Sequence, residues 1–144
     1  MKLIAIAGSL ALLAFLWADK DADPPRTVLF HGSEFTLLTG PALRKTLLGH
    51  SLTEVRCGDS SQCIEAFYER GRYSQSGDRE VNRGRYVVRQ DRYCAGWDDY
   101  RFCKAVYQTA DGRLATTNLK CGARCLKLVE QSDAPRNSDF SPID

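Results

Sequence analysis

Histidine is scarce in this sequence, and the short motifs that mark many enzymes are absent. The 144 residues include two histidines, His31 and His50. A nucleophilic serine or cysteine enzyme needs a base beside the nucleophile, and no G-x-S-x-G segment is present to carry such a serine. There is also no glycine-rich phosphate loop with its lysine, no H-E-x-x-H pair and no calcium-loop pattern. We therefore expect no enzymatic activity and no cofactor.

Long apolar runs are absent as well, except at the start of the chain. Residues 3–18 carry no charge and lie between Lys2 and the acidic, proline-containing stretch DKDADPP. This order is typical of a secretory signal, and a buried core helix is the alternative. Ala18 suits a cleavage site, whereas Leu16 is bulky for one. An uncleaved helix would span roughly 24 Å, short of the roughly 30 Å bilayer core.

Residues 1–18 are therefore expected to be a signal peptide or an N-terminal membrane anchor. In both cases the lysine stays inside and the acidic flank crosses the membrane. We expect the domain to be exported, and thus periplasmic or secreted, with an uncleaved anchor holding it at the inner membrane.

An excess of charge of one sign is also missing. The formal net charge is +2, and loss of Lys2 with a signal would leave about +1. Nucleic-acid binding draws most of its affinity from neutralised phosphates, so we expect no nucleic-acid partner. The expected partner is an envelope component or a protein, bound by a monomer that touches the membrane only through an uncleaved anchor.

Cysteine, in contrast, is plentiful. An even number of cysteines in an exported chain indicates disulfides. We expect three local pairs, each flanking a short, turn-like segment. The pair at 121 and 125 could also be half of a zinc site, but neither histidine lies at zinc-finger spacing, so no metal is expected. The predicted pairs are Cys57 with Cys63, Cys94 with Cys103, and Cys121 with Cys125.

One short helix is predicted near the start of the domain, at residues 41–48. Thr39 is a plausible N-cap, Pro41 suits the first turn, and Gly49 suits the position after the helix. Such a helix is too short to persist alone, so its leucines must pack on something. Around it the composition divides into a linker at 19–27, a disulfide-stapled domain at 28–130 and a polar, disordered tail at 131–144.

From residue 50 the apolar period changes to two, which indicates strands separated by turns. No helical run separates these strands, so a parallel sheet is excluded. The fold class is therefore mainly β (α+β), with one short N-terminal helix packed on an antiparallel meander, sandwich or small barrel. The expected core consists of Leu52, Ile64, Phe67, Tyr73, Tyr86, Val88, Phe102, Val106, Leu114, Leu126 and Leu128.

Two clusters could bind a partner. The segment 94–103, taken as a disulfide-closed loop, presents Trp97, Asp98, Asp99, Tyr100 and Arg101 together. Aromatic residues beside charged ones often dominate interface energy. We expect Trp97 to be at least partly exposed at a hairpin tip, and a tip whose aromatic side chains fill the core is the alternative.

The second cluster is a strand in which Arg83, Arg85 and Arg89 share one face while Tyr86 and Val88 take the other. Arginine suits bidentate contacts with phosphate or carboxylate. A solvated sheet face without a binding role is the alternative.

The order of motifs resembles small exported proteobacterial proteins of unknown function. The matching stretches run from Leu38-Thr39-Gly40 to Gly49, then Phe67-Tyr68, Gly84-Arg85-Tyr86, Asp91 to Cys94, and Cys103. The resemblance implies a β-rich envelope protein and no known activity, and the other four cysteines are additions to it.

These observations favour a non-enzymatic periplasmic or secreted binding module for an envelope component or a protein partner. The alternative is an inhibitor of a secreted hydrolase, because small stapled domains lose little entropy on binding. A hydrolase that uses Asp98 or Asp99 is the least favoured class.

Overall fold

A computed structural model describes residues 22–57, 61–77 and 80–135, with the side chains of 55–57 and 61–62 left out. The predicted signal or anchor, residues 1–18, and most of the predicted tail lie outside the described residues. The strands are β1 (Thr27–Phe30), β2 (Ser33–Leu37), β3 (His50–Cys57), β4 (Ser61–Phe67), β5 (Arg72–Ser76), β6 (Val81–Val88), β7 (Tyr93–Trp97), β8 (Tyr100–Gln108), β9 (Leu114–Asn118) and β10 (Lys127–Asp133). The helix is α2 (Gly40–Leu47), and two 3₁₀ segments are η1 (Glu69–Gly71) and η2 (Gly122–Cys125).

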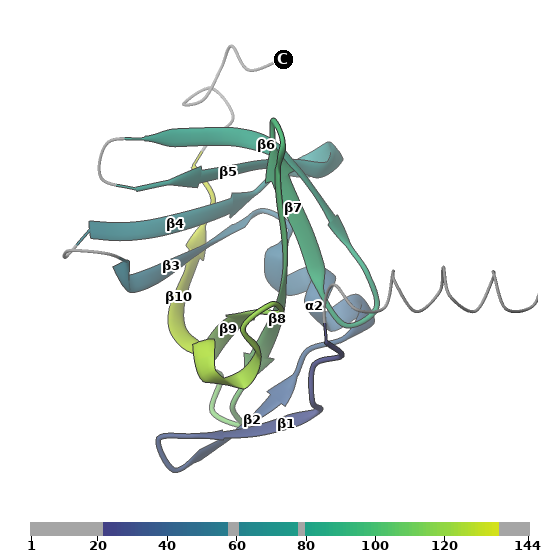
Figure 1. Ribbon diagram of the computed structural model, residues 1–144, viewed down its shortest axis with the longest axis vertical. Helices are drawn as coiled ribbons and strands as arrows, with labels where there is room; N and C mark the ends of the chain where they lie inside the picture. The colour runs from purple at the N-terminus through teal and green to yellow at the C-terminus, as the bar shows by residue number, and fades with distance from the viewer. Residues whose placement is uncertain (1–21, 58–60, 78–79, 136–144) are drawn as a thin grey trace, which may run out of the picture.

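Strands β3 to β10 form a closed antiparallel barrel (Figure 1). Each strand pairs with the next in the chain, and β10 returns to pair with β3, from Val129 opposite Glu54 to Asp133 opposite His50. Of the predicted antiparallel forms, the small barrel is therefore the observed one. Because the sheet closes, each of these eight strands pairs with a neighbour on both sides. An exposed edge strand, which is a common route to aggregation, is thereby avoided.

Strand β7 lies mostly within the segment 94–103, which was predicted to be a disulfide-closed loop, and two glycines explain how the barrel bends there. A Cβ at Gly84 would lie 1.9 Å from the carbonyl oxygen of Gly96, and a Cβ at Gly96 would lie 2.3 Å from the carbonyl oxygen of Tyr100. Only glycine permits backbones to approach this closely. The two residues therefore let β6, β7 and β8 curl into the barrel wall.

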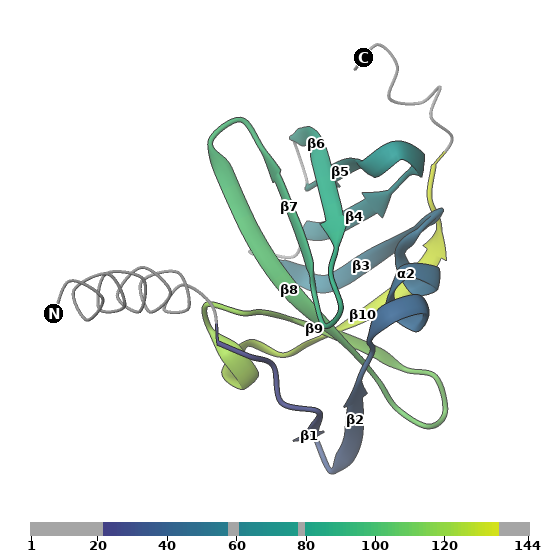
Figure 2. The ribbon, with the colours of Figure 1, turned by 90° about the vertical axis from the view of Figure 1, so that its right-hand side faces the viewer.

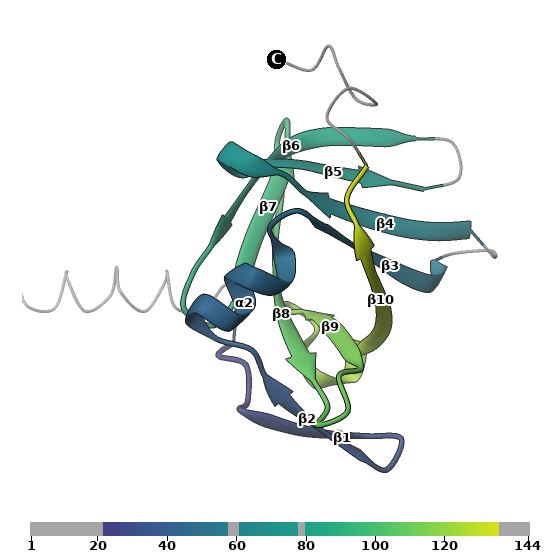
Figure 3. The ribbon, with the colours of Figure 1, turned by 180° about the vertical axis from the view of Figure 1, so that it is seen from behind.

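Helix α2 closes one end of the barrel. Leu43 and Leu47 have no exposed surface and belong to the same buried cluster as Leu52 and Phe67. Figure 3 shows the helix lying across the end that faces the viewer. The predicted helix is confirmed to within one residue, and Gly49 follows it at φ 78° with its amide donating to the Phe67 carbonyl.

A second core lies outside the barrel wall. The β1–β2 hairpin turns at His31 and Gly32, both at positive φ, and β2 pairs with the end of β8 (Figure 2). The hairpin helps to cover the outward side chains of β8 and β9. This outer cluster consists of Phe35, Ala105, Tyr107, Ala115, Leu119 and Leu126.

The predicted core is correct at most positions and wrong at two, Ile64 and Leu128. Ile64 is only partly buried and belongs to neither hydrophobic cluster, because Glu65 and Phe67 take the inward face of β4. Leu128 is 44% exposed, because β10 turns its other face inward. Lys127, opposite Thr116, and Val129, opposite Leu114, occupy that inward face. Leu126 is buried, but in the outer cluster. Strand β10 also continues to Asp133, three residues into the predicted tail.

Two of the three predicted disulfides are present, Cys94–Cys103 and Cys121–Cys125. The third predicted pair includes Cys57, whose side chain lies outside the described part of the chain. Disulfides are typical of proteins that fold outside the cytoplasm. Among the described residues, no helix is both long and apolar enough to cross a bilayer.

Candidate functional site

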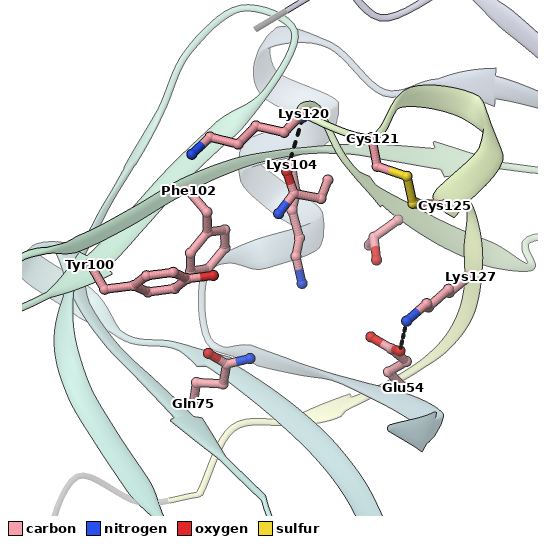
Figure 4. Close-up of a pocket in the computed structure, with 11 residues that line it drawn as sticks. Glu54, Gln75, Tyr100, Phe102, Lys104, Lys120, Cys121, Cys125 and Lys127 are labelled. Atoms are coloured by element: carbon pink, nitrogen blue, oxygen red, sulfur yellow. Dashed lines mark hydrogen bonds and ion pairs between the residues drawn. A yellow bond between two sulfur atoms is a disulfide. The ribbon is translucent and has the colours of Figure 1, made fainter. Parts of the chain in front are cut away.

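The barrel end opposite α2 is open and forms a pocket of about 610 Å³ (Figure 4). A volume of this size accommodates a small molecule. Strands β3, β5, β8, β9 and β10 and the segment around η2 contribute to the lining, which combines lysines, amides and aromatic rings. The lining residues are Glu54, Gln75, Tyr100, Phe102, Lys104, Thr116, Asn118, Lys120, Cys121, Cys125 and Lys127.

A buried carboxylate lies behind this mouth. Glu65 is 5% exposed and accepts hydrogen bonds from the Tyr73 hydroxyl at 2.7 Å and from the Tyr93 hydroxyl at 2.8 and 2.9 Å. The Lys104 ammonium completes the cluster at 3.0 Å. Burial of an isolated charge is costly, whereas a paired and fully hydrogen-bonded carboxylate is tolerated. The cluster therefore fixes Lys104 at the base of the mouth.

The two tyrosines of this cluster are held in the neutral, donating form. Burial raises the pKa of Tyr73 and of Tyr93 well above its ordinary value, and the neighbouring Glu65 charge raises both further. A tyrosine that keeps its proton can donate to the carboxylate at any physiological pH.

Two further lysines lie at the rim of the mouth. Lys127 forms an ion pair with Glu54 at 2.9 Å, and its side chain remains 57% exposed. Lys120 follows β9 and forms no ion pair with any described residue. An ammonium has three N–H donors, so Lys104 retains donors beyond the one used by Glu65, and Lys127 has donors to offer beside its ion pair with Glu54. The mouth therefore presents positive charge to an incoming group.

One wall of the mouth is aromatic. The rings of Tyr100 and Phe102 lie 5.7 Å apart, and Trp97 packs behind them with ring centroids at 5.0 and 6.2 Å. The Lys104 ammonium lies 5.2 Å from the centre of the Phe102 ring. Such a wall offers a flat apolar surface beside the cationic groups.

The predicted loop 94–103 is in fact the β7–β8 hairpin, which corrects the sequence analysis. Cys94 and Cys103 are opposite each other on paired strands, so their disulfide crosses the hairpin, and the segment between them is two strands with a tight turn instead of an irregular loop. Asp98 and Asp99 alone form its tip and are exposed.

Trp97 is half-buried, as the alternation along β7 directs it toward the barrel interior. Trp97 is partly exposed next to the tip, as predicted. It also packs against the core, so the alternative, in which the aromatic side chains of the tip fill the core, is correct in part. The aromatic and charged residues of the cluster separate, with Tyr100 at the mouth and Arg101 on the outer surface.

The predicted arginine face has the expected alternation. Arg83, Arg85 and Arg89 are exposed, whereas Tyr86 and Val88 are partly buried against the core. Arg85 and Arg89 line an outer groove of about 830 Å³ that Arg101 also lines. The structure thus brings together arginines from both predicted clusters, although Arg83 does not line the groove.

Sequence reasoning missed the charged residues of the mouth. Glu65 and Lys104 lie at inward strand positions, on the same faces as Phe67 and as Phe102 and Val106. A charge on an otherwise apolar strand face was the available signal. It was overlooked because pairing between distant strands, which makes such a charge tolerable, is not visible in the sequence.

Neither histidine contributes to the mouth, and none of the described residues form a His, Cys, Asp or Glu group able to hold a metal ion. Comparison with family models, with curated proteins and with solved structures finds no match for this chain.

Proposed function

We propose that this protein is a non-enzymatic binding module that works outside the cytoplasm and takes a small anionic ligand into the open mouth of its barrel. The observation that carries the proposal is the lining of the mouth, where Lys104 and Lys127 lie beside an aromatic wall above a buried carboxylate cluster. Export rests on the signal-like start of the chain and the disulfides, with the third pair, Cys57–Cys63, forming in the same compartment.

The chemistry of the lining defines the ligand class. An anionic group, carboxylate or phosphate, would accept hydrogen bonds from Lys104 and Lys127, whose pairing with Glu65 and Glu54 leaves donors free. A flat or apolar body would lie against Tyr100 and Phe102. Helix α2 closes the opposite end of the barrel and so limits how deeply the ligand can enter.

Binding can be tested with phenyl phosphate and phenylacetate as probes, and with benzyl alcohol as the neutral counterpart. We expect both anions to bind more tightly than the alcohol in isothermal titration, and to change the fluorescence of Trp97, which packs on Tyr100. Lys127→Gln should weaken anion binding about three- to tenfold, because it removes a charged donor at the rim.

The matched control is Lys45→Gln, an exposed lysine on α2 away from the mouth. It should leave the affinity unchanged. Equal binding of the anions and the alcohol, or equal loss in the two lysine variants, would contradict an anion site at the mouth.

A further inference from the structure

The outer face of β6, β7 and β8 carries a second cationic feature, separate from the barrel interior. We call it the arginine groove and define it by Arg85, Arg89, Arg101 and Lys120 around Val87 and the Cys94–Cys103 disulfide. No acidic residue is among the described residues that line it. The four basic side chains make no ion pair within the described part of the chain. Arg85 makes a single weak hydrogen bond, at 3.4 Å to the carbonyl of Arg70.

The strand register arranges these groups in rows. Arg85 pairs with Gly96, which pairs with Arg101, so the two arginines lie in one row across three strands. The glycine between them has no side chain, and a Cβ there would lie 3.1 Å from the Arg101 Cγ. The Arg101 stem therefore lies over Gly96 of β7, which stands between it and the Arg85 position on β6.

The next rows alternate in character. Val87 pairs with Cys94, which pairs with Cys103, so an apolar row of valine and disulfide follows the cationic one. Val87 is 49% exposed, although its surroundings are hollowed. Arg89, the residue after the end of β6, lines the same groove. At about 3.3 Å per residue, the Arg85 and Arg89 positions are about 13 Å apart, with the apolar row midway.

We propose that the arginine groove binds an extended acidic segment of a partner protein, in which two acidic residues four positions apart flank an apolar residue at the midpoint. In an extended peptide, residues i, i+2 and i+4 point to one side and span about 13 Å. This matches the spacing from Arg85 through Val87 to Arg89. Arginine forks bind carboxylates in bidentate fashion, and Arg101 can share the carboxylate held by Arg85.

A concave groove favours a chain over a membrane surface, because a flat lipid layer cannot enter it. An anionic polysaccharide would meet the basic side chains but would have no apolar group for the Val87 row. Charge and shape together therefore favour a peptide.

The test uses fluorescence anisotropy of a labelled peptide with the pattern S-E-S-L-S-E-S, together with a peptide of the same composition in the order S-L-S-E-E-S-S. In the second peptide the adjacent acids point to opposite sides. We expect the first to bind at least fivefold more tightly at low salt. Most of the binding should disappear at high salt, since exposed charges are then screened within a few ångströms.

The double variant Arg85→Ser/Arg89→Ser should weaken binding of the first peptide at least tenfold, while phenyl phosphate still binds at the mouth. Both arginines are exposed, so the fold should persist. The control Lys45→Ser/Arg124→Ser removes the same charge from exposed positions elsewhere and should leave binding unchanged. Equal affinity for the two peptides, equal loss in both double variants, or co-sedimentation with phosphatidylglycerol vesicles in place of peptide binding would overturn the proposal.

Discussion

Glu65 has the most demanding environment of any residue described here. It is an acid on the inner face of a barrel, and it is stabilised only because two hydroxyls and one ammonium converge on it from β5, β7 and β8. Along β4 the one sign of this is a charge on the same face as Phe67. The same contacts hold Lys104 in the mouth, so the stability of the barrel and its proposed ligand chemistry depend on one side chain.

Glu65→Gln should lower the free energy of unfolding by about 3 kcal/mol, because it leaves Lys104 without its counter-charge in a partly buried position. Urea unfolding measures the change. The double variant Glu65→Gln/Lys104→Met should recover much of the loss, since it removes both charges. Glu130→Gln, an exposed acid on β10, is the control and should shift stability by less than about 0.5 kcal/mol. A Glu65 variant as mild as this control would show that the cluster is dispensable.

At the scale of elements, the β7–β8 hairpin connects the two proposed sites. Its side chains Tyr100 and Phe102 form the aromatic wall of the mouth, with Trp97 behind them, and its outward Arg101 and disulfide belong to the arginine groove. A change in the twist of this hairpin would therefore alter both surfaces. The cross-strand disulfide between Cys94 and Cys103 restrains that twist.

Cys94→Ala/Cys103→Ala should lower stability by about 2–3 kcal/mol, mainly because the unfolded chain gains freedom. The hairpin register should persist, since a two-residue turn and the pairing on both sides also specify it. Denaturant unfolding with and without reductant measures the loss, and near-UV circular dichroism of Trp97 reports the hairpin. Cys121→Ala/Cys125→Ala is the comparison and should cost about 2 kcal/mol because its loop is shorter. Loss of the Trp97 signal would mean that the disulfide specifies the hairpin.

At the scale of the whole molecule, the barrel depends on tyrosines that must stay neutral. Tyr73 and Tyr93 are buried inside, while Tyr107 lies outside the wall and donates to the Pro25 carbonyl at 2.8 Å. Burial, and to a smaller extent the charge of Asp91, raises the pKa of Tyr107 to about 12. The hydroxyls of Tyr73 and Tyr93 hydrogen-bond to Glu65 inside the barrel, and that of Tyr107 links the outer layer to the segment before β1.

We therefore expect the protein to lose stability in alkali. Because the folded-state pKa values of these tyrosines exceed the unfolded value of about 10, their contribution is complete below pH 10 and is lost as the pH rises toward 12. Urea midpoints at pH 7, 9, 10.5 and 11.5, with phenolate absorbance, measure the loss. Tyr93→Phe/Tyr107→Phe should be less stable at pH 7 and should show a shallower decline. A decline of equal slope in this variant would assign the alkaline loss to other groups.

Much of the fold could be predicted from local patterns. The period of two and the turn residues indicated antiparallel strands from residue 50 onward, where the barrel strands lie, and Thr39, Pro41 and Gly49 marked the helix. The alternation of Arg85 with Tyr86 was also correct, because side chains alternate along any strand. In the segment CLKLV, residues 125–129, Leu128 and Val129 are adjacent and both apolar, so alternation alone does not decide which of them points inward. The wrong one was chosen, and Leu128 was placed in the core.

The sequence by itself determined local matters: strands, turns, the helix and which side chains lie on opposite faces of a strand. Only the tertiary structure decided that the sheet closes between β10 and β3, and hence which face of each strand became the interior. It also decided that Glu65, Lys104 and Tyr93 meet, although long stretches of chain separate them. The physical reason is that strand pairing and burial of charge are settled by partners distant in the chain, whereas turns and alternation depend on neighbours.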